Sequence, residues 1–160
     1  MSNRLINNLL KAHKDKVSKC NILCIGDIIL DHYIYGRVDR MSPEAPIPIL
    51  LFEQENFQLG GVGNVARNLS NLGAKCSLVT LSGNDISSKK INKLILEEKN
   101  IKQLKVKLID FETPIKTRYI NNFDHLVRVD KENTHFKISN KFKKNLLILL
   151  DSEIKKSDLV

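Results

Sequence analysis

The residues best suited to chemistry form a glycine-rich turn, Gly60-Gly61-Val62-Gly63-Asn64, directly before a helical pattern. Glycines let the backbone approach a ligand closely, and the free N–H groups in the first turn of a helix attract anionic or oxygen-rich groups. The turn therefore predicts a binding site for such a group, with a purely structural tight turn as the alternative.

Two familiar nucleotide-binding patterns fit this turn poorly. It lacks the Gly-Lys-Ser/Thr ending of a P-loop. Residues 61–66 match the G-x-G-x-x-A dinucleotide fingerprint, and Asp85 lies near the distance expected for a ribose-binding acid. That fingerprint follows the first strand of its domain, whereas the polar residues 53–56 precede the turn here. A Rossmann oxidoreductase is therefore disfavoured.

The elements that must position this turn alternate between strands and helices. Residues 21–29 form an apolar run, interrupted by Gly26-Asp27, that predicts a strand buried on both faces of a parallel sheet. After the turn, Val65, Leu69 and Leu72 share one helical face. The features expected next are the end of this helix at Gly73, a strand over 75–81, a helix marked by Ile91, Leu94 and Ile95, and a strand over 101–109. This alternation predicts an α/β fold.

Two further β regions are expected outside this alternation. Residues 33–38 and 47–52 are rich in β-branched or aromatic residues, and prolines at positions 43, 46 and 48 forbid a regular helix or central strand between them. Residues 114–130 contain two alternating runs around a polar turn at 121–124, which predicts a hairpin.

Helices are expected near both ends of the chain. An amphipathic pattern predicts one over residues 3–17, and a second is predicted over 139–156 with Ser139 as its N-cap. The apolar residues expected to form the buried face of the second helix are Phe142, Leu146, Leu149 and Leu150. Residues 157–160 have the character of a strand onset.

The composition indicates one globular unit of 160 residues. Apolar residues make up 42% and charged residues 28%, which is ordinary for a packed domain. No apolar run approaches the ~20 residues needed to cross a bilayer, so a membrane protein is not expected. The net charge is +8, but the lysines are dispersed and aromatic residues make up only 6%. A solvated lysine surface is therefore favoured over nucleic-acid binding.

The cysteines and histidines predict neither disulfides nor a metal site. Cys20, Cys24 and Cys76 lack a CxxC pair and lie in or beside apolar stretches, which is typical of reduced, packed thiols. The four histidines lack the paired spacing of a zinc site. Because the N-terminal segment also lacks the continuous apolar core of a targeting peptide, we expect the chain to stay in the cytoplasm.

Several motifs resemble those of a known family. Residues 60–66, followed by Gly73 and Gly83, resemble the N-terminal signature of the ribokinase-like (PfkB) sugar kinases. Gly26, Asp27 and Asp31 are similar to that family's first substrate-binding element. The four segments that resemble its heptose 7-phosphate kinase branch are GDIILDHYIY at 26–35, RMSPEAPIP at 40–48, Lys116-Thr117-Arg118 and Arg128-Val129-Asp130.

The resemblance implies a fold and a division of the chain. The fold would be a ribokinase-like three-layer α/β sandwich, of which residues 1–160 supply the N-terminal half. A small β-lid from about 33–57 and 114–130 would cover the sugar and could form a homodimer contact. The catalytic aspartate and Gly-Ala-Gly-Asp motif of the family have no counterpart in this sequence, so we expect the catalytic half to be absent and the chain alone to be inactive.

The resemblance also implies a substrate site. Asp31 could accept hydrogen bonds from two sugar hydroxyls, and the Asn64 amide could donate and accept, beside Gly60 and Gly61. The alternatives are that Asp31 caps a turn and that Asn64 caps a helix. The residues expected to bind a sugar phosphate are Arg118, Arg128 and Lys116, with Glu44 as a further contact to hydroxyls; the alternative for each is an ordinary surface position.

The reaction implied is the transfer of the ATP γ-phosphoryl group, with Mg²⁺, to the anomeric hydroxyl of D-glycero-D-manno-heptose 7-phosphate. This chain would supply only the positioning of the sugar phosphate, and no catalytic residue is assigned to it. Two alternatives remain: another sugar kinase of the same superfamily, and a non-catalytic remnant that at most binds sugar.

Overall fold

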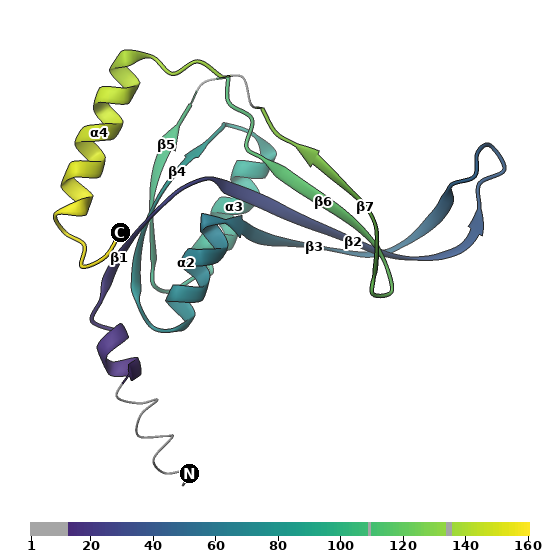
Figure 1. Ribbon diagram of the computed structural model, residues 1–160, viewed down its shortest axis with the longest axis horizontal. Helices are drawn as coiled ribbons and strands as arrows, with labels where there is room; N and C mark the ends of the chain where they lie inside the picture. The colour runs from purple at the N-terminus through teal and green to yellow at the C-terminus, as the bar shows by residue number, and fades with distance from the viewer. Residues whose placement is uncertain (1–12, 109, 134–135) are drawn as a thin grey trace, which may run out of the picture.

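The computed structural model describes residues 13–108, 110–133 and 136–160, which contain two sheets (Figure 1). The first, here called the body sheet, is parallel and has the strand order β1-β4-β5. Its strands are β1 (Asn21–Ile25), β4 (Lys75–Ser82) and β5 (Ile101–Lys107). The second, the lid sheet, has the order β3-β2-β6-β7. Its strands are β2 (Ile28–Met41), β3 (Pro48–Gly61), β6 (Ile115–Asn121) and β7 (Asp124–Lys131).

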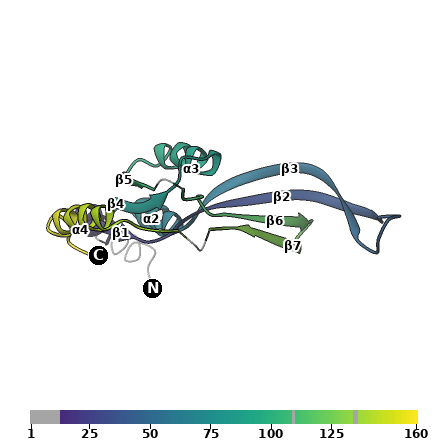
Figure 2. The same ribbon diagram turned by 90° about the horizontal axis from the view of Figure 1, so that it is seen from above.

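Helices cover both faces of the body sheet, which gives the expected three layers. Helices α2 (Val62–Asn71) and α3 (Ile86–Leu96) pack on the face that carries Leu78, in the main apolar core. Helix α4 (Asn140–Ile154) lies on the other face, where Leu146 and Leu150 line a small pocket together with Val79. Figure 2 shows the lid sheet extending away from these helices. The described helices are all too short or too polar to span a bilayer.

Small residues let α2 approach the sheet closely. Its buried residues are Gly63, Ala66 and Ser70, whereas Val65 is 51% and Leu72 is 61% exposed. Of Val65, Leu69 and Leu72, which the sequence places on one helical face, only Leu69 packs against the core. Larger side chains on the inner face would hold the helix away from strands that are themselves filled with apolar residues.

The chain changes sheets at Gly26-Asp27. Strand β1 pairs with β4, where the Gly26 N–H donates to the Val79 carbonyl, and β2 pairs with β3 and β6. The single strand predicted over 21–29 is thus two strands in two sheets. Asp27 makes the break possible because its carbonyl accepts from the Val62 N–H at the start of α2 instead of from a neighbouring strand.

The lid hairpin of β2 and β3 is longer than the sequence predicts. Strand β3 runs through the polar residues 53–56 and includes Gly60 and Gly61, which were expected in a loop. Polar residues are tolerated because both sides of this part of β3 are exposed to solvent. Pro43 and Pro46 lie in the connecting loop as expected, and β6 and β7 form the predicted second hairpin.

Most of the other predicted elements are confirmed. Ser139 caps α4 by accepting from the Phe142 N–H at 3.2 Å, and Gly73 follows α2 with a φ of 104°. The predicted buried face of α4 is half-buried. Residues 157–160 contribute an isolated parallel bridge between Leu159 and Ile22. Residues 13–17 of the predicted N-terminal helix are helical, and the rest of it lies outside the described residues.

The body contains the three cysteines as free thiols. Cys24 and Cys76 are buried on neighbouring strands, and Cys20 is half-buried. Burial first, and then the neighbouring Cys24, raises the pKa of Cys76 to about 11, so this thiol stays protonated at neutral pH. A buried, protonated thiol is a poor nucleophile, which fits the packing role predicted for it.

Candidate functional site

A cavity of about 450 Å³ lies where the body sheet meets the lid sheet. Its apolar wall includes Ile29 and Leu81, which lie on β2 and at the end of β4, and its polar lining includes Asp27, Lys116 and Asn133. The volume lies within the range of small-molecule sites, and parallel α/β sheets bind ligands at this carboxyl edge. The cavity therefore marks the region in which to look for a site.

Charged side chains on the lid sheet continue from this cavity and form what we call the charged cluster, which consists of Asp31, Lys116, Arg118, Arg128 and Asp130. Strand register brings them together, because Lys116 pairs with both Asp31 and Asp130, and Arg118 pairs with Arg128. Residues paired across strands, and those two apart along a strand, share one face of a sheet. The cluster is thus a property of the sheet geometry.

Ion pairs hold the cluster together. Arg118 Nη1 donates to Asp31 Oδ1 at 2.6 Å, and both side chains are 18% exposed. Asp130 forms ion pairs with Arg128 Nε at 2.9 Å and with Lys116 Nζ at 3.7 Å. Burial lowers the pKa of Arg118, but the hydrogen bond to Asp31 and the nearby acidic groups outweigh burial and raise it above its ordinary value.

Three cations face two carboxylates in this cluster, which leaves one excess positive charge. The hydrogen bonds that the described residues make to the Arg118 guanidinium all use Nη1, so the Nε and Nη2 groups remain to bind a ligand. These two groups form a fork of N–H donors, and such a fork matches the oxygens of a phosphate or carboxylate. The cluster can therefore bind an anion at the edge of the cavity.

Two glycines allow close contacts at the backbone that leads into α2, one with Asp31 and one with Asp27. A Cβ atom on Gly60 would collide with Asp31 Oδ2. Gly61 has a φ of 56°, and a Cβ there would collide with the Asp27 carbonyl oxygen. Only glycine fits both positions without a shift of the backbone or of the carboxylate. The turn singled out in the sequence therefore lies beside Asp31.

Asn64 lies in the first turn of α2 and is exposed. Its Oδ1 accepts from Arg67 Nη2 at 3.2 Å, and Gly61 is the N-cap residue of the helix. The alternative in which Asn64 caps the helix is therefore wrong, because Asn64 is the third residue of α2. That Asn64 and Asp31 contact the same ligand stays a prediction.

Glu44 is not brought to the charged cluster. It lies in the loop between β2 and β3, at the tip of the lid sheet, far from α2 (Figure 1). Its side chain is exposed, and its N–H donates to Ser42 Oγ. The stiff, proline-flanked loop predicted around Glu44 is present, but it is at the opposite end of the hairpin from Gly60.

Sequence reasoning missed two members of the site, Tyr33 and Asp130. The Tyr33 ring lies under the Arg118 guanidinium, with 5.1 Å between Arg118 Cζ and the ring centroid. Asp130 connects Lys116 to Arg128. Strand alternation could have found both, because Tyr33 lies two residues after Asp31 and Asp130 two residues after Arg128.

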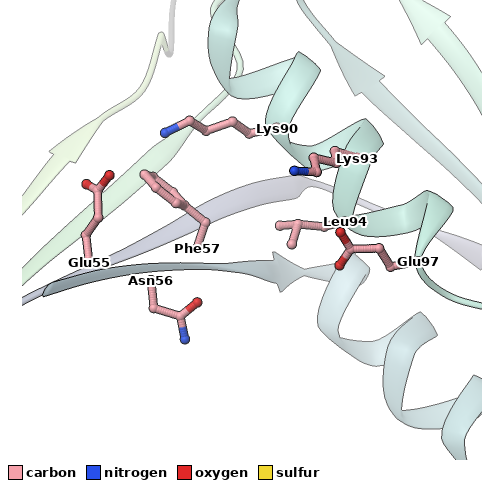
Figure 3. A pocket seen from close by; sticks show the side chains of 7 residues that line it. All are labelled: Glu55, Asn56, Phe57, Lys90, Lys93, Leu94 and Glu97. Atoms are coloured by element: carbon pink, nitrogen blue, oxygen red, sulfur yellow. The ribbon is translucent and has the colours of Figure 1, made fainter.

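A second pocket, of about 280 Å³, lies on the opposite face of the lid sheet, between β3 and α3 (Figure 3). Lys90 Nζ of α3 lies 3.3 Å from the centroid of the Phe57 ring, and His32 stacks on this ring at 4.2 Å. His32 Nε2 also contacts Glu55 Oε2 at 2.8 Å. Because Phe57 belongs to the lid sheet and Lys90 to the body, these contacts hold the two parts together.

The residues present do not fit a Mg²⁺ site. Within the described parts of the chain, no group of three His, Cys, Asp or Glu side chains could hold a metal ion. The carboxylates of the charged cluster are already paired with Arg118, Arg128 and Lys116. The chemistry that these residues support is the binding and orientation of an anionic, hydroxyl-rich ligand.

Comparison with known proteins identifies relatives in sequence. The chain is 40% identical over 126 residues to the bifunctional protein HldE of Paramagnetospirillum magneticum, a match that covers 77% of this chain and 26% of the relative. It is 34% identical over 146 residues to HldE of Rhodopseudomonas palustris, a match that covers 90% of this chain and 30% of the relative. The chain thus spans 26% and 30% of the length of these two curated relatives. No family model matches it.

Solved structures show the same fold at lower sequence identity. A possible 1-phosphofructokinase of Thermotoga maritima has a TM-score of 0.65 at 18% identity, over 87% of this chain and 43% of the other. A carbohydrate kinase of Agrobacterium tumefaciens has a TM-score of 0.58 at 19% identity, over 70% of this chain and 35% of the other. A ribokinase of Cryptococcus neoformans in complex with ADP has a TM-score of 0.52 at 15% identity, over 76% of this chain and 38% of the other.

The motifs, the fold and these matches agree. The expected ribokinase-like α/β architecture is present, and the relatives in sequence carry the name HldE. The chain is homologous to part of the bifunctional HldE proteins, and its fold is that of the solved sugar-kinase structures.

Proposed function

We propose that this chain binds D-glycero-D-manno-heptose 7-phosphate and is the sugar-holding part of a kinase that phosphorylates the anomeric hydroxyl. The observation that carries the proposal is the charged cluster, with three cations and two carboxylates, beside a cavity of about 450 Å³. The homology to HldE and the heptose-branch motifs support this substrate over other sugars.

Each residue of the cluster has a role in this proposal. Asp31 Oδ2, which lies beside Gly60, accepts from sugar hydroxyls, while Oδ1 stays with Arg118. Asn64 reaches the sugar from the first turn of α2. The phosphate lies against the free edge of Arg118, with Lys116 and Arg128 adding positive charge.

Glu44 has a different place in the proposal. It contacts sugar hydroxyls only after the lid tip moves toward the cavity, because the structure separates the tip from the charged cluster. A hinge motion of this kind is an ordinary response of a lid to its ligand.

The phosphoryl donor in this proposal is ATP with Mg²⁺, as in the implied family reaction. The ribokinase of the same fold in complex with ADP supports an adenine nucleotide. The described residues of this chain do not form the metal site, and transition-state charge stabilisation is usually the largest contribution to catalysis. We therefore propose that residues 1–160 correspond to the N-terminal half of the kinase domain and bind sugar phosphate without turnover.

Two expectations about context belong to the proposal. Val127 and Val129 on β7 are more than half exposed, which supports a homodimer contact through the lid sheet. The three free cysteines support action in the reducing cytoplasm.

The proposal is tested by isothermal titration of the purified chain with heptose 7-phosphate. Arg118→Ala combined with Arg128→Ala is expected to weaken binding at least about tenfold, since a hydrogen bond between charged groups contributes about 1.5–3 kcal/mol. Arg37→Ala is the matched control, because the Arg37 side chain is 60% exposed and forms its ion pair with Asp39, outside the charged cluster. Unchanged affinity in the double variant would contradict the assignment.

A second measurement tests the proposed lack of turnover. ATP consumption in the presence of heptose 7-phosphate is expected to stay at background. A turnover number near the ~10 s⁻¹ of typical enzymes, from a monodisperse preparation, would show that the chain contains catalytic machinery that the proposal places elsewhere.

A further inference from the structure

We infer that Tyr33 positions the Arg118 guanidinium for the substrate phosphate and thereby sets the preference for a phosphorylated over an unphosphorylated sugar. The inference rests on the proposed function, and it assigns a specificity role to a residue outside the set that sequence reasoning selected. It starts from the way in which Arg118 is held.

The Arg118 guanidinium is fixed from two directions. At one edge, Nη1 donates to Asp31 Oδ1 at 2.6 Å and to the Lys116 carbonyl at 3.5 Å. At its face lies the Tyr33 ring, with 5.1 Å between Arg118 Cζ and the ring centroid. The edge contacts alone leave the guanidinium free to rotate about its hydrogen bond to Asp31. The face of the Tyr33 ring removes this freedom.

The orientation that results suits a phosphate. With Nη1 engaged, the Nε–H and the two Nη2 hydrogens form the opposite edge of the fork, which is the edge used for bidentate contacts to phosphate oxygens. A long arginine side chain loses rotamer entropy when it binds a ligand. Holding it in advance removes part of this cost, which is the usual basis of preorganisation.

The strand register explains why Tyr33 is the residue in this position. Tyr33 pairs with Arg118 across β2 and β6, and Arg118 pairs with Arg128 across β6 and β7. Tyr35, two residues along the same face, stacks against Tyr33 with ring centroids 6.3 Å apart. The ring is therefore restrained on one side by Tyr35 and covered by Arg118.

Arg118 is the cation through which selectivity should act. Its side chain is 18% exposed, whereas that of Arg128 is 55% exposed and its Nε is occupied by Asp130. Exposed charges are screened by water and salt, so a partly buried fork discriminates more strongly between a phosphate and a hydroxyl. An unphosphorylated sugar makes no use of the fork, and its binding should not depend on Tyr33.

The test is a double-mutant cycle on the full chain, with heptose 7-phosphate and the unphosphorylated heptose as probes. Tyr33→Leu is expected to weaken binding of the phosphorylated sugar about five- to tenfold, the effect of a partly desolvated cation–π contact. Tyr33→Phe should stay within about twofold, because the ring remains. Tyr33→Leu added to Arg118→Gln should have no further effect, and binding of the unphosphorylated heptose should be unchanged.

Tyr119→Leu is the matched control. It removes a tyrosine of similar exposure from the lid sheet, but from the opposite face, where Tyr119 pairs with Ile34. Circular dichroism verifies that each variant is folded. Equal losses for the two sugars, or additive effects of Tyr33→Leu and Arg118→Gln, would overturn the inference.

A second readout separates this inference from the proposed function. In the nuclear magnetic resonance spectrum, the Arg118 Nε–H signal should show a ring-current shift in the wild type and in Tyr33→Phe that Tyr33→Leu lacks. Titration with inorganic phosphate should move this signal, with tighter binding where the ring is present. If phosphate behaves in this way and neither heptose binds, the proposed substrate is wrong and the positioning role stands. If the ring-current shift is absent, the positioning role is wrong even if the sugar phosphate binds.

Discussion

The body sheet and the lid sheet are stabilised in different ways. In β4 of the body, five of eight residues are buried, and Leu78 is fully buried in the main apolar core. In β7 of the lid, all eight residues are exposed. The body, together with the ends of β2 and β3 that carry Ile28, Leu30 and Leu59, is held by apolar burial, whereas the outer part of the lid is held mainly by backbone pairing between long strands.

The difference shows why the charged cluster is on the lid. A charge buried in the body would carry a large desolvation cost, whereas a half-exposed sheet face accepts paired charges at little cost. The same difference predicts that the lid opens locally more easily than the body, since regions with few buried apolar contacts have low local stability.

The largest difference is expected for truncation of apolar side chains. Leu78→Ala in the body should lower the free energy of unfolding by about 2–5 kcal/mol, because it leaves a cavity in a packed core. Val127→Ala on the lid, where the side chain is 52% exposed, should change it by less than about 0.5 kcal/mol. Urea denaturation followed by circular dichroism measures both. Similar losses for the two variants would show that β7 is packed as tightly as the core of the body.

Gly60→Ala, in the lid, should have a large effect on ligand binding, in contrast to the small effect of Val127→Ala on stability. The new Cβ would push the Asp31 carboxylate away from the turn before α2, so binding of heptose 7-phosphate should weaken about tenfold or more. Gly73→Ala is the control in the body. Its φ of 104° predicts a loss of about 1 kcal/mol in stability and no loss of binding. Equal binding by the two variants would remove Gly60 from the site.

Lys90→Met should loosen the contact between body and lid. The substitution keeps a long side chain but removes the ammonium group that lies over Phe57, and this contact is expected to contribute about 0.5–1 kcal/mol. Hydrogen exchange at the β3 amides should become roughly two- to fivefold faster, while exchange in β4 stays unchanged. Lys89→Met, at the neighbouring exposed position, is the control. Faster exchange in both sheets would indicate a global rather than a local effect.

Glu153 should give the body a small dependence of stability on pH. The hydrogen bond from Lys156 lowers its pKa, against the opposing effect of burial, and Lys102 contributes attraction. Its folded-state pKa thus lies below the unfolded value of about 4.3. The stabilisation is complete above that value and is lost as the pH falls through the folded pKa. Glu153→Gln and Lys156→Gln should both flatten the decrease in stability measured by urea denaturation between pH 6 and pH 3, and an unchanged slope in both would contradict this account.

The body could be predicted from the sequence almost entirely. Apolar periodicity identified α3, where Ile91 and Ile95 are buried, and the capping residues Ser139 and Gly73 marked the ends of helices. These signals are local, and burial on both sides makes them strong. The helix α2 was also expected, but its inner face could not be read from apolar spacing, which cannot show that close packing favours Ala66 over Val65 there.

The lid and the site were only partly predictable. Resemblance selected Asp31, Gly60 and Arg118, which the structure brings together, but it also selected Glu44, which lies at the other end of a 14-residue hairpin strand. No local pattern gives the register between β2 and β6, on which the pairing of Tyr33 with Arg118 depends. Polar strands exposed on both faces also lack the alternation that would mark them.

The two-residue link Gly26-Asp27 makes the long hairpin a lever. Strands β2 and β3 have 14 residues each, which corresponds to an arm of about 46 Å at about 3.3 Å per residue. A rotation of roughly 5° at the link would move the far end of the arm by about 4 Å and the fourth residue by only about 1 Å. The charged cluster sits close to the pivot and Glu44 at the end of the arm. A pivoting lid therefore amplifies a small movement at the ligand into a large displacement of the proline loop while the ion pairs beside the pivot stay intact.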